Sequence, residues 1–484
     1  MSKTAFTQAT LTLYAYHLRT DISKGAEQLS DEADQIWEGL VKLGHALQIP
    51  ALQHLKQELI CYTDGKYEPT VENQLTFQRG SLLRAENKYL KLNFTASIKG
   101  ENVELNGKLG AFRLDDTYAI DLTLSCDSID ELKQLNPKEL LPPQYIQASI
   151  GKTLFLYGKL AAPCEDDDSL EKLADDYVAQ LMVDGIPLEF NSKGKLLSNL
   201  IFEYETLEIE PSKRCHLLIW FINEYTSTEK QLKLVGSHIL PLLCARHKIL
   251  SAYNDYQPYN HQAKNLYSQL EQHVKNFENI ATNQSDQLED RLEKLKKLLA
   301  RVATKVVENS KHLWYMKDYE TTIATNIKNY EFNYKKLREL PDNNLSFVEE
   351  FIELTHNKYE AQLKIDRQYL EPEAKLLQQL IDTIRGMVAI DQVESDRLHE
   401  DNAKKREKKL ELVITGVGTG LAFSSVSAAV MPHPSQTLPP DLKSRIGGSS
   451  FLIDIGFHLL CGLIVGMFMA LIFSTIRSSY RSKS

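Results

Sequence analysis

The stretch KKREKKLELVITGVGTGLAFSSVSAAVM occupies residues 404–431, and IGFHLLCGLIVGMFMALIFSTI occupies residues 455–476. From about Leu412 and from Ile455, each stretch has about 20 residues with few or no charges, enough for a helix to cross roughly 30 Å of hydrocarbon. We therefore predict two membrane-spanning helices, at 412–431 and 455–476, with a lipid bilayer as a partner. A buried core helix is the alternative for each segment.

Basic residues flank both outer ends of this pair of segments. We call the first flank the basic collar; it consists of Lys404, Lys405, Arg406, Lys408 and Lys409. The tail after the second segment is also basic, with Arg477, Arg481 and Lys483. Because cytoplasmic flanks of membrane helices are enriched in Lys and Arg, the pattern predicts a cell inner-membrane protein with both chain termini in the cytoplasm.

The first apolar segment is rich in small and hydroxyl residues. A stripe of such residues favours close packing of two helices. The functional alternative is a helix that lines a water-filled path, where polar residues need not face lipid. On that interpretation the pore-lining residues are Gly416, Thr419, Gly420, Ser424 and Ser427. In the second segment Asp454 and His458 lie one turn apart, and a divalent cation is the one candidate cofactor that this pair suggests.

The rest of the chain is acidic, since the 484 residues carry a net charge of −9 in spite of the basic flanks. This argues against a nucleic-acid-binding protein, which would show a basic patch or stripe. The six cysteines form no CxxC pair and no Cys/His set at zinc-ligand spacing. The sequence leaves open whether the protein binds a metal, and the cysteine pattern is best explained by reduced thiols.

Hydrophobic periodicity divides the chain into four parts. Helical spacing predicts an N-terminal helical cap over residues 1–79. Strand-like runs around one predicted helix indicate a cytoplasmic α/β domain over 80–225. Long amphipathic patterns predict a helical stalk, a coiled-coil hairpin, over 226–403, with a turn at 341–344. The membrane region then covers 404–484, and the fold class is α+β with a helical stalk and two transmembrane helices.

No motif in the predicted α/β domain indicates an enzyme. Gly151, Lys152 and Thr153 resemble the end of a phosphate-binding loop, but the first glycine of that motif is replaced by Ile146. The acidic run 165–168 is best explained as a solvated helix start, with weak cation sensing as the alternative. The charges of four glutamates are interpreted as solvated: Glu203, Glu205, Glu208 and Glu210. Three histidines are interpreted as structural: His216, His238 and His247.

The order of parts resembles the CorA family of magnesium channels and transporters. The stalk segment Arg367–Pro372, followed by Leu376 and Leu380, resembles the arginine, leucine and proline segment of that family. Residues 382–397 also resemble a signature of a group of bacterial membrane proteins without an assigned function. The resemblance covers about a third of the chain and implies a homo-oligomer, pentameric as in CorA, whose first membrane helix lines the pore.

The chain departs from CorA at the family's defining motif. Gly-Met-Asn is absent, and the corresponding end of the first apolar segment reads AVMPHP at residues 429–434. The resemblance therefore implies the architecture and not the ion.

We expect an oligomeric ion channel or transporter gated by its cytoplasmic domain. The alternatives are a non-conducting membrane-anchored scaffold or sensor, and a ligand-triggered membrane effector. The sequence does not identify the regulatory ligand.

Overall fold

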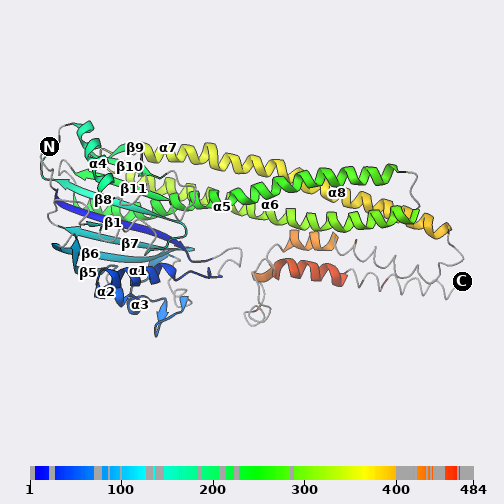
Figure 1. Ribbon diagram of the computed structural model, residues 1–484, viewed down its shortest axis with the longest axis horizontal. Coiled ribbons are helices and arrows are strands. Elements are labelled where there is room, and N and C mark those ends of the chain that lie inside the picture. Colours follow the sequence, from blue (N-terminus) through cyan, green and yellow to red (C-terminus); the bar gives the residue numbers. More distant parts are fainter. Residues whose placement is uncertain are drawn as a thin grey trace. The chain divides into compact units, whose positions relative to one another are not determined.

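The computed structural model (Figure 1) describes residues 6–20, 28–69, 79–84, 88–98, 101–126, 135–136, 146–162, 164, 166–181, 188–206, 214–222, 228–283 and 288–398, and of the remaining chain 418, 422–431, 434–436, 439, 453–465, 468 and 472. The chain divides into two compact units. The first contains Met1–Thr20, Ser30–Pro258 and Met316–Ile365, and the second contains Asp21–Leu29, Tyr259–Tyr315 and Asp366–Ser484.

A large mixed sheet forms the centre of the first unit (Figure 1). Its strands are β1 (Phe6–Leu18), β4 (Arg79–Ser81), β5 (Leu90–Ile98), β6 (Glu101–Leu114), β7 (Thr117–Cys126), β8 (Gly151–Leu160), β9 (Glu189–Leu196), β10 (Asn199–Glu205) and β11 (Cys215–Ile222). The order is β4-β6-β7-β1-β8-β11-β10-β9, with β5 also paired to β6. All pairings are antiparallel except that of β8 with β11. The α+β class is thus confirmed.

Strand β1 lies where the sequence predicted a helix. Residues 6–18 pair with β7 on one side and β8 on the other, and nearly every side chain from Leu11 to Tyr16 is buried. A strand covered on both faces shows no alternation of apolar and polar residues. The spacing of Leu11, Tyr14 and Leu18 therefore also fitted a helical period, and the prediction of helix here was wrong.

Helices cover both faces of this sheet. Helix α1 (Gln35–Ala46) places Trp37 against Tyr118 of β7, with ring centroids 5.2 Å apart. Helix α4 (Asp167–Leu181) covers the same face, where the Tyr204 hydroxyl donates to Asp175 at 2.8 Å. On the other face, the Tyr16 hydroxyl donates to the Leu240 carbonyl of α5 (Glu229–Thr282) at 2.8 Å. The short elements α2 (Pro50–Gln53), α3 (Leu55–Glu58), β2 (Tyr62–Thr63) and β3 (Lys66–Tyr67) follow α1.

Long helices make up most of the remaining described chain. They are α5, α6 (Leu288–Arg338), α7 (Ser346–Leu354) and α8 (Ala361–Leu398), and a π-helical turn at Thr355–Glu360 joins α7 to α8. The turn predicted at 341–344 does separate α6 from α7. At 1.5 Å per residue, α5 with 54 residues is about 80 Å long.

Helix α6 carries a regular heptad of buried side chains. Seven residues spaced seven apart along the helix are each at most 2% exposed: Leu295, Val302, Asn309, Met316, Ile323, Tyr330 and Leu337. This is the repeat of a helix packed along one seam. Asn309 is its one polar member, and its amide nitrogen and oxygen have no hydrogen-bond partner within the described part of the chain.

The second unit has a core of its own, built between α6 and α8. Its buried members are Leu292, Leu295, Leu298, Val302, Leu377, Leu380, Ile381, Ile384 and Val388. Val274, Phe277 and Ile280 of α5 pack against this cluster. At its edge, Arg291 Nε donates to Asp391 Oδ2 at 2.8 Å, and Asp391 is 1% exposed. Three helical segments therefore share one apolar core in this unit.

The prediction of two membrane-spanning helices was wrong. Across the described residues, the structure contains no helix whose length and apolar character suffice to cross a membrane. Of the predicted spans, the structure describes residues 418, 422–431, 455–465, 468 and 472. The predicted inner-membrane localisation and the transmembrane part of the fold class are corrected accordingly.

Candidate functional site

A buried group of polar residues lies in the first unit, on the sheet face that α5 covers. The parallel register of β8 and β11 sets Thr153 beside His216, and the antiparallel register of β10 and β11 sets Glu205 beside His216. Glu203 follows on the same face two residues away, because strand side chains alternate. Helix α5 contributes Arg246 and His247. We call these six residues the buried polar cluster.

One chain of hydrogen bonds runs through the cluster. Glu203 Oε1 lies 2.9 Å from His216 Nε2, His216 Nδ1 lies 2.8 Å from Thr153 Oγ1, and Thr153 Oγ1 lies 2.7 Å from His247 Nε2. Since a carboxylate only accepts, His216 Nε2 donates to Glu203. A neutral His216 then accepts from the Thr153 hydroxyl at Nδ1, and Thr153 accepts in turn from His247. Every bond in this chain is satisfied with both imidazoles neutral.

Arg246 balances the two carboxylates. Its guanidinium donates to Glu205 at 3.1 and 2.8 Å and to Glu203 at 3.3 Å. The Arg246 and Glu203 side chains are each 3% exposed, and Glu205 is 23% exposed. The Arg246 guanidinium also lies over the Phe351 ring of α7, 4.8 Å from its centroid. A bidentate contact between an arginine and a carboxylate fixes the relative orientation of the two side chains as well as pairing their charges. It therefore holds α5 on the strands in one register.

The pKa values follow from burial and this pairing. Burial raises the pKa of Glu205, but the charge and hydrogen bonds of Arg246, together with the nearby Arg214 and His216, outweigh burial and lower the pKa to about 2. Burial also raises the pKa of Glu203, but the Arg246 charge and the hydrogen bond from His216 together leave that pKa below its ordinary value. Burial lowers the pKa of His216, and burial together with the neighbouring His216 and Arg246 lowers the pKa of His247 far more. The cluster therefore holds charged carboxylates, a charged Arg246 and neutral histidines at pH 7.

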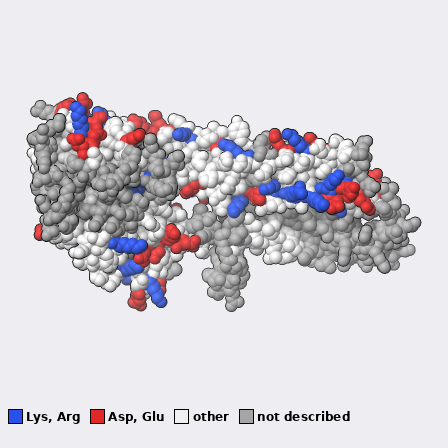
Figure 2. Space-filling model, viewed as in Figure 1, with Lys and Arg blue, Asp and Glu red and all other residues white. Residues whose placement is uncertain are grey.

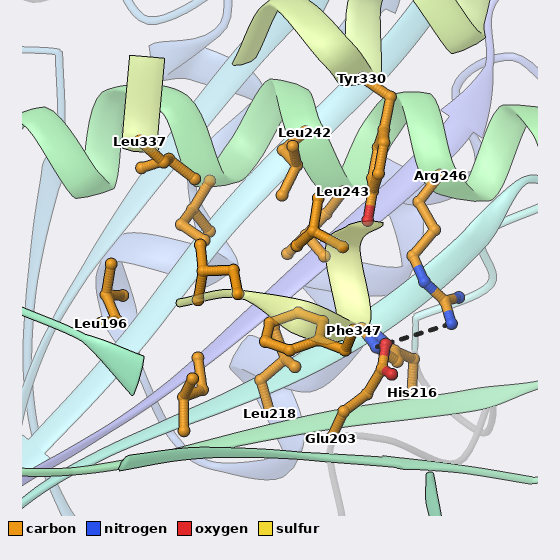
Figure 3. Close-up of a pocket in the computed structure, with 14 residues that line it drawn as sticks. Leu196, Glu203, His216, Leu218, Leu242, Leu243, Arg246, Tyr330, Leu337 and Phe347 are labelled. Carbon is orange, nitrogen blue, oxygen red and sulfur yellow. Dashed lines mark hydrogen bonds and ion pairs between the residues drawn. The ribbon is translucent and has the colours of Figure 1, made fainter. Parts of the chain in front are cut away.

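A small cavity adjoins the cluster (Figure 3). Apolar side chains such as Leu196, Leu242 and Leu337 line most of it, and Glu203, His216, Arg246 and Tyr330 make its polar end. The space open to the centre of a water molecule is about 10 Å³, which holds about one water. Within the described part of the chain, Arg246 Nε has no hydrogen-bond partner. A buried water at this end would satisfy it.

The order carboxylate, imidazole, hydroxyl is the order used by nucleophilic hydrolases. Here the Thr153 side chain is fully buried, and its hydroxyl is shared between two imidazoles. The adjoining cavity has room for about one water. The arrangement is suited to fixing α5 on the sheet rather than to catalysis. Gly151 permits it, since a Cβ there would meet His247 Nδ1 at 2.4 Å.

The interpretation of Glu203 and Glu205 as solvated charge was wrong, and Glu208 and Glu210 lie outside the described residues. His216 and His247 are buried structural residues, as expected, and His238 pairs with Asn333 at 3.0 Å. Glu203 and Glu205 are not solvated charges, because their partner Arg246 lies 43 and 41 residues further along the chain. The signal available in the sequence was Arg246 and His247 inside an otherwise apolar helical stretch.

Of the residues predicted to line a pore, the structure describes only Ser424 and Ser427. Ser424 is half-buried, and Ser427 Oγ lies 2.6 Å from His458 Nδ1. Gly416, Thr419, Gly420 and the whole basic collar lie outside the described residues. Asp454 accepts from the Ser435 backbone N–H at 2.6 Å. Among the residues that the structure describes, no group of three or more His, Cys, Asp or Glu side chains is placed to hold a metal ion.

Comparison of the chain with protein-family models, with curated proteins and with solved structures finds no match. The resemblance to the CorA family, together with the ion transport that it implied, is therefore corrected: neither a family match nor a membrane-spanning helix among the described residues supports it.

Proposed function

We propose that this chain is a non-enzymatic scaffold that associates with further copies of itself through its helical second unit. One observation carries the proposal. The part of α8 that belongs to this unit leaves large apolar side chains in solvent: Tyr369, Leu376, Ile390 and Val393 are 74%, 51%, 66% and 54% exposed. Tyr369 and Leu376 lie seven residues apart on one side of the helix, and exposed apolar surface is one mark of an interaction site.

These exposed residues are not the face that α8 uses within its own unit. The buried residues of the helix, among them Leu377, Ile384 and Val388, pack on α6. At 100° per residue, Tyr369, Leu376 and Ile390 lie about 80–140° around the helix from the centre of that buried face, and Val393 lies about 160° from it. A helix with a second apolar stripe has the pattern of a helix that packs against two neighbours. We call the stripe formed by Tyr369, Leu376, Ile390 and Val393 the α8 stripe.

The remaining features favour a scaffold over the other classes. The carboxylate, imidazole and hydroxyl of the buried polar cluster are sealed from solvent, which supports a structural role. The net charge of −9 disfavours nucleic acid. On the face shown in Figure 2, basic and acidic side chains lie next to one another over the long helices and form no large field of one sign. Mixed charge of that kind suits protein association.

The molar mass of the full chain in solution tests the proposal. Light scattering across a hundredfold range of protein concentration is expected to show a dimer or larger species that dissociates on dilution. A monomer at every concentration would contradict self-association.

A further inference from the structure

We propose that the imidazolium form of His356 holds the π-helical turn Thr355–Glu360 on α6, and that this attachment breaks as the pH rises and His356 loses its proton. The residues that carry the inference all belong to the first unit. The inference is therefore independent of the proposed self-association through the second unit, and it adds a pH-sensitive contact to the first.

The His356 ring lies between two carboxylates. Its Nε2 lies 3.0 Å from Oε1 of Glu331 on α6, and its Nδ1 lies 3.0 Å from Oε2 of Glu360, four residues further along the chain. An ionised carboxylate only accepts hydrogen bonds, and a neutral imidazole donates from one nitrogen alone. Both contacts are therefore hydrogen bonds only when His356 carries a proton on each ring nitrogen. We call these two contacts the His356 bridge.

The charges around the bridge favour the imidazolium. In the described part of the chain, the charged groups that face His356 are Glu331 on α6 and Glu360 on its own turn, and their hydrogen bonds and charges raise the pKa of His356. Lys364 of α8 donates to the other oxygen of Glu360 at 2.7 Å, and this hydrogen bond is the main cause that lowers the pKa of Glu360. Glu360 therefore stays ionised and keeps its second oxygen for His356.

Loss of the proton removes one of the two hydrogen bonds. The ring nitrogen without a proton then presents its lone pair to a carboxylate, which repels it. The neutral ring keeps its contact with Glu360, because both residues lie on one turn and Glu360 is less screened by solvent, at 17% exposed against 43% for Glu331. The contact between the turn and α6 is therefore the one that is lost.

The π-helical turn is held from two sides. The N–H of Ala361 bonds to the His356 carbonyl five residues earlier, which is the π-helical pattern. The Tyr359 ring packs on Tyr253 of α5, with ring centroids 4.3 Å apart. Loss of the His356 bridge thus frees the side of the turn that faces α6, while the tyrosine contact with α5 remains. Single π-helical turns inside α-helices are frequent at functional sites.

The titration of His356 in the full chain tests the bridge. Histidine ring signals of isotope-labelled protein are recorded by NMR between pH 5 and pH 9, and the signal missing from His356→Gln identifies His356. We expect its midpoint above about 6.5, the ordinary value for histidine. Glu331→Gln and Glu360→Gln each remove one carboxylate charge and are each expected to lower the midpoint. Lys358→Gln, an exposed lysine on the same turn, is the control and is expected not to lower it.

Hydrogen exchange tests whether the bridge holds the turn. Between one pH unit below the measured midpoint and one above it, after correction for the intrinsic pH dependence of exchange, the backbone amides of residues 355–361 are expected to lose about 2- to 5-fold of their protection, as for an exposed ion pair. His356→Gln has no imidazolium, so its turn is expected to show the lower protection at both pH values. Lys358→Gln is expected to keep the pH dependence of the unaltered chain.

Each outcome decides the proposal. A midpoint above about 6.5 that falls in both glutamate variants, with protection of the turn lost on deprotonation, supports it. A midpoint at or below about 6.5 in the unaltered chain overturns it, and that measurement requires no variant to fold. A midpoint that Glu331→Gln leaves unchanged overturns the contact with α6. Protection of the turn that follows the pH equally in the unaltered chain and in His356→Gln also overturns the proposal.

Discussion

The two units of this chain treat their side chains in opposite ways. The first buries charged residues deeply and gives them partners, as Glu203, Glu205 and Arg246 show. The second buries an almost wholly apolar core and leaves the α8 stripe in solvent. Buried charges that are paired within the unit need no outside partner, whereas an exposed apolar helix face gains free energy when it is covered. This difference is the reason for proposing the second unit as the site of association.

The largest effect is expected from breaking the buried polar cluster. Arg246→Ala leaves Glu203 buried with its charge uncompensated, which costs about 3–5 kcal/mol of the free energy of unfolding. Chemical denaturation followed by tryptophan fluorescence measures the change, since Trp220 lies in the same sheet. Lys233→Ala, in a fully exposed pair with Glu229, is the control and is expected to leave stability unchanged. Equal effects for the two variants would refute a central role for the cluster.

Two isoleucines of α8 compare the buried and exposed faces of one helix. Ile384 is fully buried in the core of the second unit, and Ile390 is 66% exposed. Ile384→Ala is expected to lower the free energy of unfolding by about 2–5 kcal/mol, because it removes packed atoms and leaves a cavity. Ile390→Ala is expected to change it by less than about 0.5 kcal/mol at protein concentrations where the chain is monomeric. Thermal unfolding at low concentration measures both, and a large loss for Ile390→Ala would assign it to the core.

The pH dependence compares a buried histidine with an exposed one. The pKa of His247 is lowered by burial, so its unfolded form binds the proton first and stability falls as the pH drops below about 6.5. The pKa of His356 is raised by hydrogen bonds to Glu331 and Glu360, so its contribution is present below about 6.5 and is lost as the pH rises through the higher folded value. Each proton changes stability by at most about 1.4 kcal/mol per pH unit.

Variants of the two histidines separate these opposite contributions. The free energy of unfolding, measured between pH 5 and pH 8, is expected to fall on acidification less steeply in His247→Gln than in the unaltered chain. It is expected to fall more steeply in His356→Gln, and by a smaller amount, because His356 is largely exposed and solvent screens its pairs. Parallel curves for all three proteins would show that neither imidazole contributes to the pH dependence.

The sequence predicted the helical half of the molecule better than the sheet. Long stretches with a 3.6-residue period, such as that of α6, are the clearest local signal that a sequence carries. Strand β1 is buried on both faces from Leu11 to His17, and its apolar residues also fitted a helical spacing. Glu203 gave no sign of a partner on α5. The predicted membrane helices rested on the length of two nearly uncharged stretches and on their basic flanks, and the described residues contain no helix that could cross a membrane.

Hydrogen exchange on the full chain, compared at low and high protein concentration, tests the contrast between the two units most directly. We expect backbone amides of α8 around residues 369–383 to gain protection as the concentration rises, while those of β8, β10 and β11 stay unchanged. Exchange that does not depend on concentration in α8, or protection that grows in the sheet instead, would contradict the assignment of self-association to the α8 stripe.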